Sequence, residues 1–272
     1  MDRQIDISGT RIEVIERGAG PPLLFLHPGI GIAPDSAVLN MLAERFHVLA
    51  PSHPGFGESG LASDTSTVED LAYHYLDFMK RLDVRDVRLV GVGLGGWIAA
   101  EIAVMNSSRL SQLVLANSVG IKVGDRETRD IVDIFAITKE DLASRSYHDP
   151  NAARRDLGAL SHEQRRIIAR NWESTARFGW SPYMHNPKLR GRLQRLDVPT
   201  LILWGESDRI VSVDYGRALC KAIPGARFEL IPSAGHYPHI EQPARFAQAI
   251  LDFAGEGRHE TRTASPADTL SP

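Results

Sequence analysis

The sequence predicts an α/β domain built on a mostly parallel, eight-stranded sheet with helices on both faces. Six short, continuously apolar runs alternate along the chain with amphipathic segments of helical periodicity. Two runs near the N-terminus alternate apolar and polar residues instead, which is typical of antiparallel strands with one face in water. Together these patterns indicate a parallel sheet that carries an antiparallel edge.

The eight predicted strands follow in chain order. The two alternating runs are residues 5–7 and 11–16. Continuous apolar runs suit parallel strands that are covered on both faces. These runs are residues 23–26, 48–50, 87–90, 113–116, 201–204 and 228–231.

Amphipathic segments between these runs predict the helices that cover the sheet. They span residues 35–45, 68–82, 94–106, 213–222 and 241–254. Asp35 and Thr67 stand at the start of two of them, and both residue types are favoured at helix N-caps.

Residues 120–197 interrupt the alternation, because no strand-like run occurs there. Residues 138–148 and 161–180 have helical patterns, and the interval is too long for a single crossover. We interpret 120–197 as a helical cap, with ordinary core helices as the alternative, and 1–119 with 198–255 as the core. The polar stretch 256–272, rich in Ser, Thr and Pro, predicts a disordered tail.

The overall composition excludes several classes of function. The net charge is −3 without a dominant basic cluster, which argues against nucleic-acid binding. The 10 histidines show no metal-ligand spacing, and the single cysteine, Cys220, excludes an internal disulfide. No run approaches the roughly 20 apolar residues of a membrane span or the pattern of a signal peptide. We therefore expect a cytoplasmic protein without a membrane or nucleic-acid partner, as a monomer or homodimer.

The stretch LVGVGLGGW, residues 89–97, admits two interpretations. Gly91, Gly93 and Gly96 match the G-x-G-x-x-G of a dinucleotide site, whereas G-x-S-x-G of a nucleophile elbow is matched except that Gly93 replaces the serine. A dinucleotide site needs an acidic residue at the end of the next strand, and that strand ends in Asn117 and Ser118. About four strands also precede the loop, so the elbow interpretation is favoured.

Four further motifs follow predicted strands, and together they carry a resemblance. They are FLHPGIG (25–31), APSHPGFGESG (50–60), LWGESDRIV (203–211) and IPSAGHYPH (231–239). In this order they resemble the α/β-hydrolase fold family over residues 1–255. The nearest group has a cap and cleaves esters, lactones or C–C bonds beside a carbonyl in small molecules. The resemblance implies no metal, nucleotide or flavin cofactor.

Carried over by position, the resemblance also implies a catalytic site. It assigns Gly93 to the nucleophile position, Asp208 and His236 to the triad acid and base, and the backbone N–H groups of Gly29 and Leu94 to the oxyanion hole. Family members often have Gly where this chain has Pro28, but the N–H comes from the neighbouring position. Glycine adopts the positive φ of an elbow freely, so Gly93 keeps the turn and removes the hydroxyl.

The substrate is expected to be a small molecule bound beneath the cap. Trp172, Trp180, Tyr183 and Met184 are predicted to line the chamber, with packing inside the cap as the alternative for each of them.

Three hypotheses explain an elbow without serine. In the first, the protein is an enzyme in which His236 acts as general base on water, or on the substrate in a lyase, isomerase or cyclase reaction. In the second, it binds a small ligand without catalysis. In the third, Gly93 is an engineered or sporadic replacement in an ordinary serine hydrolase.

Overall fold

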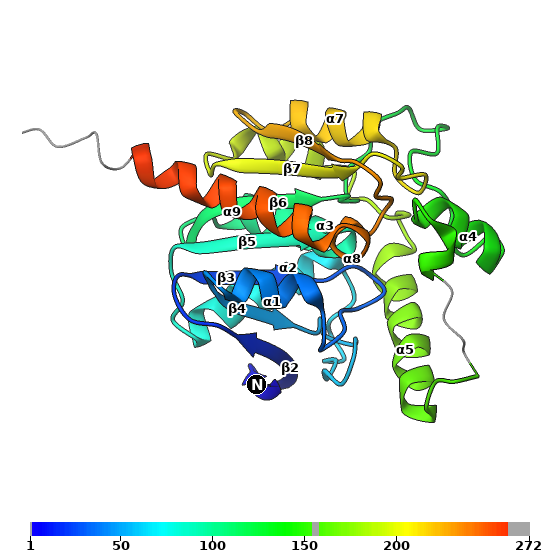
Figure 1. Cartoon of the computed structure of the whole chain (residues 1–272), viewed down its shortest axis with the longest axis horizontal. Helices are drawn as coiled ribbons and strands as arrows, with labels where there is room; N and C mark the ends of the chain where they lie inside the picture. The colour runs from blue at the N-terminus through cyan, green and yellow to red at the C-terminus, as the bar shows by residue number, and fades with distance from the viewer. Residues whose placement is uncertain (1, 154–157, 261–272) are drawn as a thin grey trace, which may run out of the picture.

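The computed structural model describes residues 2–153 and 158–260 of the chain. Within them, eight strands form one sheet in the order β1-β2-β4-β3-β5-β6-β7-β8 (Figure 1). The strands are β1 (Asp2–Ile7), β2 (Thr10–Arg17), β3 (Pro22–Leu26), β4 (His47–Pro51), β5 (Val87–Val92), β6 (Leu110–Ala116), β7 (Thr200–Gly205) and β8 (Arg227–Ile231). β2 pairs antiparallel with β1 and β4, and the remaining pairs are parallel. The predicted fold class, including the antiparallel edge, is confirmed.

Helices cover both faces of the sheet and bury a separate apolar cluster on each. α2 (Val68–Arg81), α3 (Leu94–Met105) and α7 (Val213–Lys221) pack on one face, while α1 (Ala37–Ala43) and α9 (Pro243–Glu260) pack on the other. Alternate residues of β3 divide between the two clusters, since Leu24 faces the first and Phe25 the second. This two-sided burial explains why the parallel strands have continuous apolar sequences.

The two predicted helix starts have different outcomes. Thr67 caps α2 as predicted: its hydroxyl accepts the Asp70 N–H at 3.1 Å, and the Asp70 carboxylate accepts the Thr67 N–H at 2.8 Å. The prediction that Asp35 starts a helix is wrong, because α1 begins after Ser36. Asp35 lies in a turn that the Ser36 N–H closes onto the carbonyl of Ala33 at 3.1 Å.

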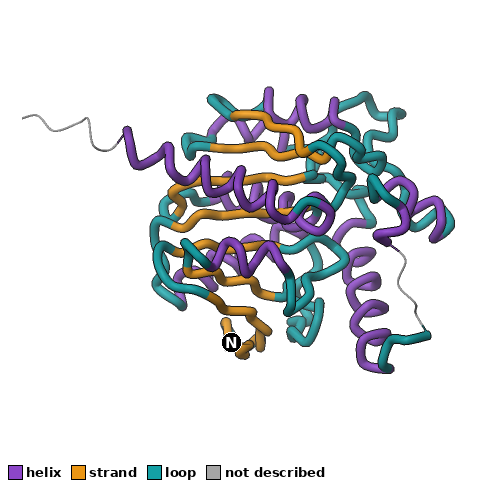
Figure 2. Tube along the Cα trace, in the orientation of Figure 1, coloured by secondary structure: helices purple, strands orange, loops and turns teal. Residues whose placement is uncertain are grey.

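The residues between β6 and β7 form a helical insertion. It contains α4 (Lys139–Ser146), η1 (Pro150–Ala153), α5 (His162–Gly179), α6 (Leu189–Arg192) and η2 (Leu193–Arg195). α4 and α5 stand beyond the ends of the central strands, at the right of the view (Figure 1; Figure 2). Leu189 and Leu193 are fully buried in the main core, so the last part of the insertion packs into the body of the domain.

α9 extends farther than the sequence indicated. It runs to Glu260 and so overlaps the start of the predicted tail at 256–272, of which residues 261–272 lie outside the described part of the chain. Pro243 is well suited to the first helical position, and Phe246, Ile250 and Phe253 repeat at helical spacing on the buried face. Across the described residues, no helix combines the length and hydropathy needed to cross a membrane.

Candidate active site

The elbow is a sharp turn between β5 and α3. Gly93 adopts φ +54° and ψ −113°, a combination that strains any residue with a side chain. Its N–H donates to the carbonyl of Ala116 at 2.9 Å. A Cβ on Gly95 would lie 2.1 Å from the carbonyl oxygen of Leu26, so α3 approaches the sheet closely only because glycine follows the turn.

An imidazole–carboxylate pair lies beside this elbow. Asp208 follows β7 and His236 follows β8, and Nδ1 of the histidine is 2.8 Å from Oδ2 of the aspartate. The same Oδ2 accepts the side-chain amide of Asn117 at 2.7 Å, while Oδ1 accepts the N–H groups of Ile210 and Val211 at 2.9 and 3.0 Å. Because the carboxylate accepts at Nδ1, the proton of a neutral imidazole resides there and Nε2 is left as the basic nitrogen.

The free nitrogen of the pair points at the elbow. A Cβ built on Gly93 would lie 3.4 Å from His236 Nε2 and 3.4 Å from Pro28 Cβ. His236 and Asp208 are 7% and 5% exposed, so the pair is largely shielded from water. The structure therefore brings the three predicted catalytic positions together, with the imidazole directed at the glycine and the carboxylate behind it.

Two backbone donors lie on the same wall. Leu94 is the first residue of α3, and Gly29 lies in the loop after β3. Among the described residues, no acceptor has hydrogen-bond geometry to either N–H. Side chains of the insertion hold the loop that contains Gly29. Thr175 Oγ1 donates to the carbonyl of Gly29 at 3.0 Å, and Asn171 Nδ2 donates to that of Ile30 at 3.1 Å. Such paired donors are suited to an oxyanion.

A cavity of about 50 Å³ lies between these core groups and the insertion. Its walls are mostly apolar, and the polar side chains that reach it are few. Its lining comprises Gly29, Ile30, Leu94, Val119, Ile131, Ile134, Leu142, Ser146, Trp172, Thr175, Tyr183, Met184, Ile210, His236 and Tyr237. The cavity is thus lined by the predicted base, His236, and by both residues that carry the N–H donors, Gly29 and Leu94.

Three of the four predicted substrate-binding residues line this cavity. They are Trp172, Tyr183 and Met184. Trp180 does not line it: α5 ends at Gly179, and the Trp180 side chain is 61% exposed. Its ring packs against Phe135, with 5.8 Å between centroids, and borders an adjoining cavity of about 390 Å³.

Several lining residues are not marked by any sequence motif. Ile131, Ile134 and Leu142 come from the insertion, as does Ser146 at the end of α4. Apolar residues at helical spacing identify a buried face of an isolated helix, but they do not tell which element faces a cavity. The positions of these residues depend on contacts between segments far apart in the chain.

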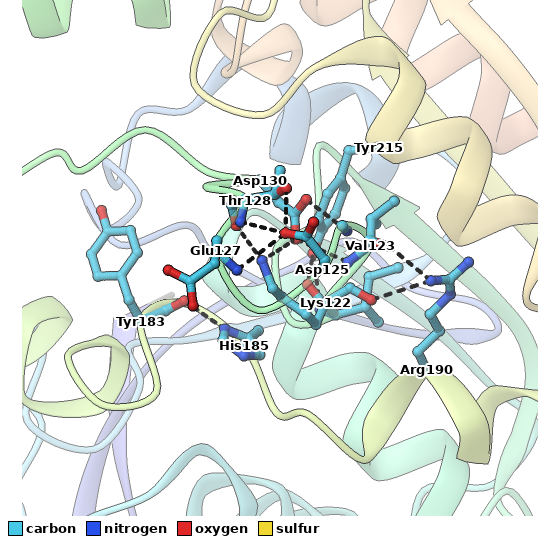
Figure 3. A network of polar contacts seen from close by, with 12 residues as sticks. Lys122, Val123, Asp125, Glu127, Thr128, Asp130, Tyr183, His185, Arg190 and Tyr215 are labelled. Atoms are coloured by element: carbon cyan, nitrogen blue, oxygen red, sulfur yellow. Dashed lines mark hydrogen bonds and ion pairs between the residues drawn. The ribbon is translucent and has the colours of Figure 1, made fainter.

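Polar contacts fix the loop of residues 121–134 that forms one wall of the cavity (Figure 3). The Asp130 carboxylate accepts the N–H groups of Val123 and Gly124, both at 2.9 Å, and pairs with Lys122 Nζ at 3.0 Å. The Tyr215 hydroxyl bonds to the N–H and carbonyl of Ile121, both at 2.8 Å. The loop is therefore tied to α7 and to itself.

Buried histidines support the core side of the site. His27 Nδ1 bonds to the carbonyl of Pro28 at 2.7 Å, and its Nε2 accepts the N–H of His53 at 2.9 Å. Burial lowers the pKa of His27 to about 4 and that of His239 to about 3. These imidazoles are consequently neutral near pH 7, where they pack and position the loops.

Comparison with known proteins identifies the family to which the chain belongs. Residues 23–249 match the Alpha/beta hydrolase family. The chain is 29% identical to 2-hydroxymuconate semialdehyde hydrolase of Pseudomonas sp. (strain CF600), over 93% of this chain and 94% of the relative. It is 26% identical to 2-hydroxy-6-oxo-6-(2'-aminophenyl)hexa-2,4-dienoic acid hydrolase of Metapseudomonas resinovorans, over 97% and 94%. A solved meta-cleavage product hydrolase from Pseudomonas fluorescens IP01 shares the fold, with a TM-score of 0.79 at 21% identity over 93% of this chain and 97% of that one.

Proposed function

The chain belongs to the alpha/beta hydrolase family, and from that premise we propose that it hydrolyses a small organic molecule at an ester, lactone or C–C bond beside a carbonyl group. Both curated relatives described above carry names of hydrolases, and the names of their compounds include a hydroxyl and a semialdehyde or oxo group. The observation that carries the proposal is His236 Nε2, which faces the Gly93 position with Asp208 bonded behind it.

The proposed reaction uses water in place of a serine nucleophile. A water beside Gly93 donates to His236 Nε2, and the imidazole takes its proton as the oxygen attacks the carbonyl carbon. The N–H groups of Gly29 and Leu94 bind the oxyanion that forms. When the tetrahedral intermediate collapses, the imidazolium returns the proton to the leaving group and the substrate bond breaks. Asp208 orients the imidazole and stabilises its charged form.

This chemistry favours a substrate whose carbonyl is already activated. No acyl-enzyme can form at Gly93, and sites that have lost a triad member retain roughly a 10³–10⁴-fold acceleration over water. Conjugation or a good leaving group lowers the remaining barrier. Aryl esters and vinylogous ketones therefore suit the site better than simple amides.

The size of the cavity favours rearrangement of side chains of the insertion when a substrate enters. Its volume is about 50 Å³, whereas a dry cavity that binds benzene measures roughly 150 Å³. The 121–134 loop, α4 and α5 all contribute to the wall opposite the core. Rearrangement of the apolar side chains of this wall admits the substrate, and their return excludes bulk water.

The decisive experiment screens aryl esters and vinylogous ketones on the wild-type protein beside Gly93→Ser. We expect wild-type turnover without a burst, and its loss in His236→Ala and Asp208→Asn. Turnover that is indifferent to both changes contradicts the proposal. A ligand that binds at equilibrium and is recovered unchanged identifies a binding protein instead. Activity found only in Gly93→Ser identifies a serine hydrolase whose nucleophile has been replaced.

A further inference from the structure

A buried serine hydroxyl lines the cavity and has no role in the reaction proposed above. Ser146 is the last residue of α4, is 2% exposed and lines the cavity together with His236. The polar neighbour of its Oγ is the Tyr237 hydroxyl, although the pair does not reach full hydrogen-bond geometry. Thr175 in the same cavity bonds to the carbonyls of Gly29 and Asn171 at 3.0 and 2.8 Å. Buried hydroxyls are normally bonded in this way, whereas Ser146 Oγ has only the incomplete contact with Tyr237.

The backbone around Ser146 is fixed against the catalytic base. The N–H of His236 donates to the carbonyl of Ser146 at 2.6 Å. A Cβ on Gly235 would lie 2.4 Å from the same carbonyl, so the close approach requires glycine at that position. The end of α4 is therefore held beside the imidazole, and rotation of the Ser146 side chain can change the direction of its hydroxyl.

A second hydroxyl lies next to it. The Tyr237 ring is 5.0 Å from the His236 ring and 5.3 Å from the Tyr147 ring, measured between centroids. Burial raises the pKa of Tyr237 well above its usual value, and the neighbouring Ser146 hydroxyl opposes part of that rise. Both hydroxyls are neutral at pH 7, and rotation about χ1 turns that of Ser146 from Tyr237 to the cavity.

We propose that Ser146 is a catalytic residue that orients the attacking water. This inference rests on the proposed function, in which His236 Nε2 accepts one proton of that water. Ser146 Oγ accepts the hydrogen bond from the other O–H, which leaves an oxygen lone pair directed at the substrate carbonyl. The insertion thereby contributes a reacting-site group as well as a wall.

The test compares Ser146→Ala with Ser144→Ala on the same helix. The Ser144 hydroxyl is already bonded to the carbonyl of Asp141 at 2.9 Å, so it is a matched control. We expect Ser146→Ala to lower kcat roughly 10- to 100-fold with KM little changed, the effect of one hydrogen bond to a reacting group. Its Tm stays close to that of the wild type, because the removed hydroxyl is not in a full hydrogen bond. Ser144→Ala keeps the wild-type kcat.

The outcomes separate this inference from the proposed function. Wild-type kcat in Ser146→Ala, together with an inactive His236→Ala, overturns the role of Ser146 and leaves the proposed function standing. Wild-type activity in His236→Ala overturns the proposed function itself. A lower Tm in Ser146→Ala, together with a lower kcat and a higher KM, also overturns the inference. Covalent labelling of Ser146 by a serine-directed phosphonate does so too. Independently of activity, a high-resolution crystal structure should contain a water bridging His236 Nε2 and Ser146 Oγ, and its absence contradicts the proposal.

Discussion

The core side and the insertion side of the cavity are built differently. On the core side, the Asp208 carboxylate accepts four hydrogen bonds, and His236 Nε2 is left open towards Gly93 beside the N–H groups of Gly29 and Leu94. On the insertion side, aliphatic and aromatic side chains form most of the wall, and the Ser146 hydroxyl reaches no full hydrogen-bond geometry with any described residue. A saturated network holds one geometry, whereas apolar packing tolerates rearrangement. The core side thus fixes the catalytic base, whereas the insertion side determines what enters and, through Ser146, orients the water.

The largest effect is expected from His236→Ala, which removes the base and leaves the wall intact. General-base catalysis contributes typically 10²- to 10⁴-fold, so kcat should fall by about that factor while the fold persists. Steady-state kinetics on an aryl ester provides the measurement. His47→Ala is a matched control, because His47 bonds to Glu16 at the opposite end of β4. An equal loss of kcat in His47→Ala would show that the effect of His236→Ala is not specific to the catalytic base.

Acid should weaken the core side through its buried histidines. Burial lowers the pKa of His27 to about 4 and that of His239 to about 3, whereas both titrate near 6.5 when unfolded. Below pH 6.5 the unfolded chain binds protons that the folded chain does not. The free energy of unfolding therefore falls, by about 1.4 kcal/mol per pH unit for each histidine until its folded pKa is reached. Above pH 6.5 this stabilising contribution is fully present.

Urea unfolding at several pH values between 7 and 4.5 measures this slope. His239→Phe keeps a ring between Phe25 and Phe246 and removes one titrating group. Its slope should be shallower than that of the wild type by the contribution of one histidine. An unchanged slope would mean that His239 is not responsible for the acid sensitivity.

The same division explains what the sequence could predict. Asp208 and His236 follow strands whose apolar runs are continuous, and parallel strands deliver their ends to one edge of the sheet. The described part of the insertion contains no strand whose end would place its residues at the site. Ile131 reaches the cavity because it bridges to Val211, a contact that neither local pattern encodes. For the same reason helical spacing could not tell that Trp180 faces solvent.

Gly93→Ser tests the core side with a smaller change in energy. At φ +54° the serine is strained, so we expect a loss of about 1–3 kcal/mol in the free energy of unfolding. The new Cβ meets His236 Nε2 and Pro28 Cβ at ordinary contact distance, so the variant should fold. It should then give a burst with an aryl ester. Gly93→Ala carries the same strain without a hydroxyl, and a burst from it would exclude serine as the cause.

The smallest effect is expected from Ile134→Ala, which opens the insertion side. Ile134 is half-buried and lines the cavity, whereas Ile168 on α5 lies outside it and serves as the control in Ile168→Ala. For an ester with a bulkier acyl group, KM should fall roughly 3- to 10-fold in Ile134→Ala, with kcat unchanged. Steady-state kinetics across a series of acyl sizes measures this shift. If kcat fell instead, the 121–134 loop would also orient reacting groups, and the division between chemistry and selection would have to be drawn elsewhere.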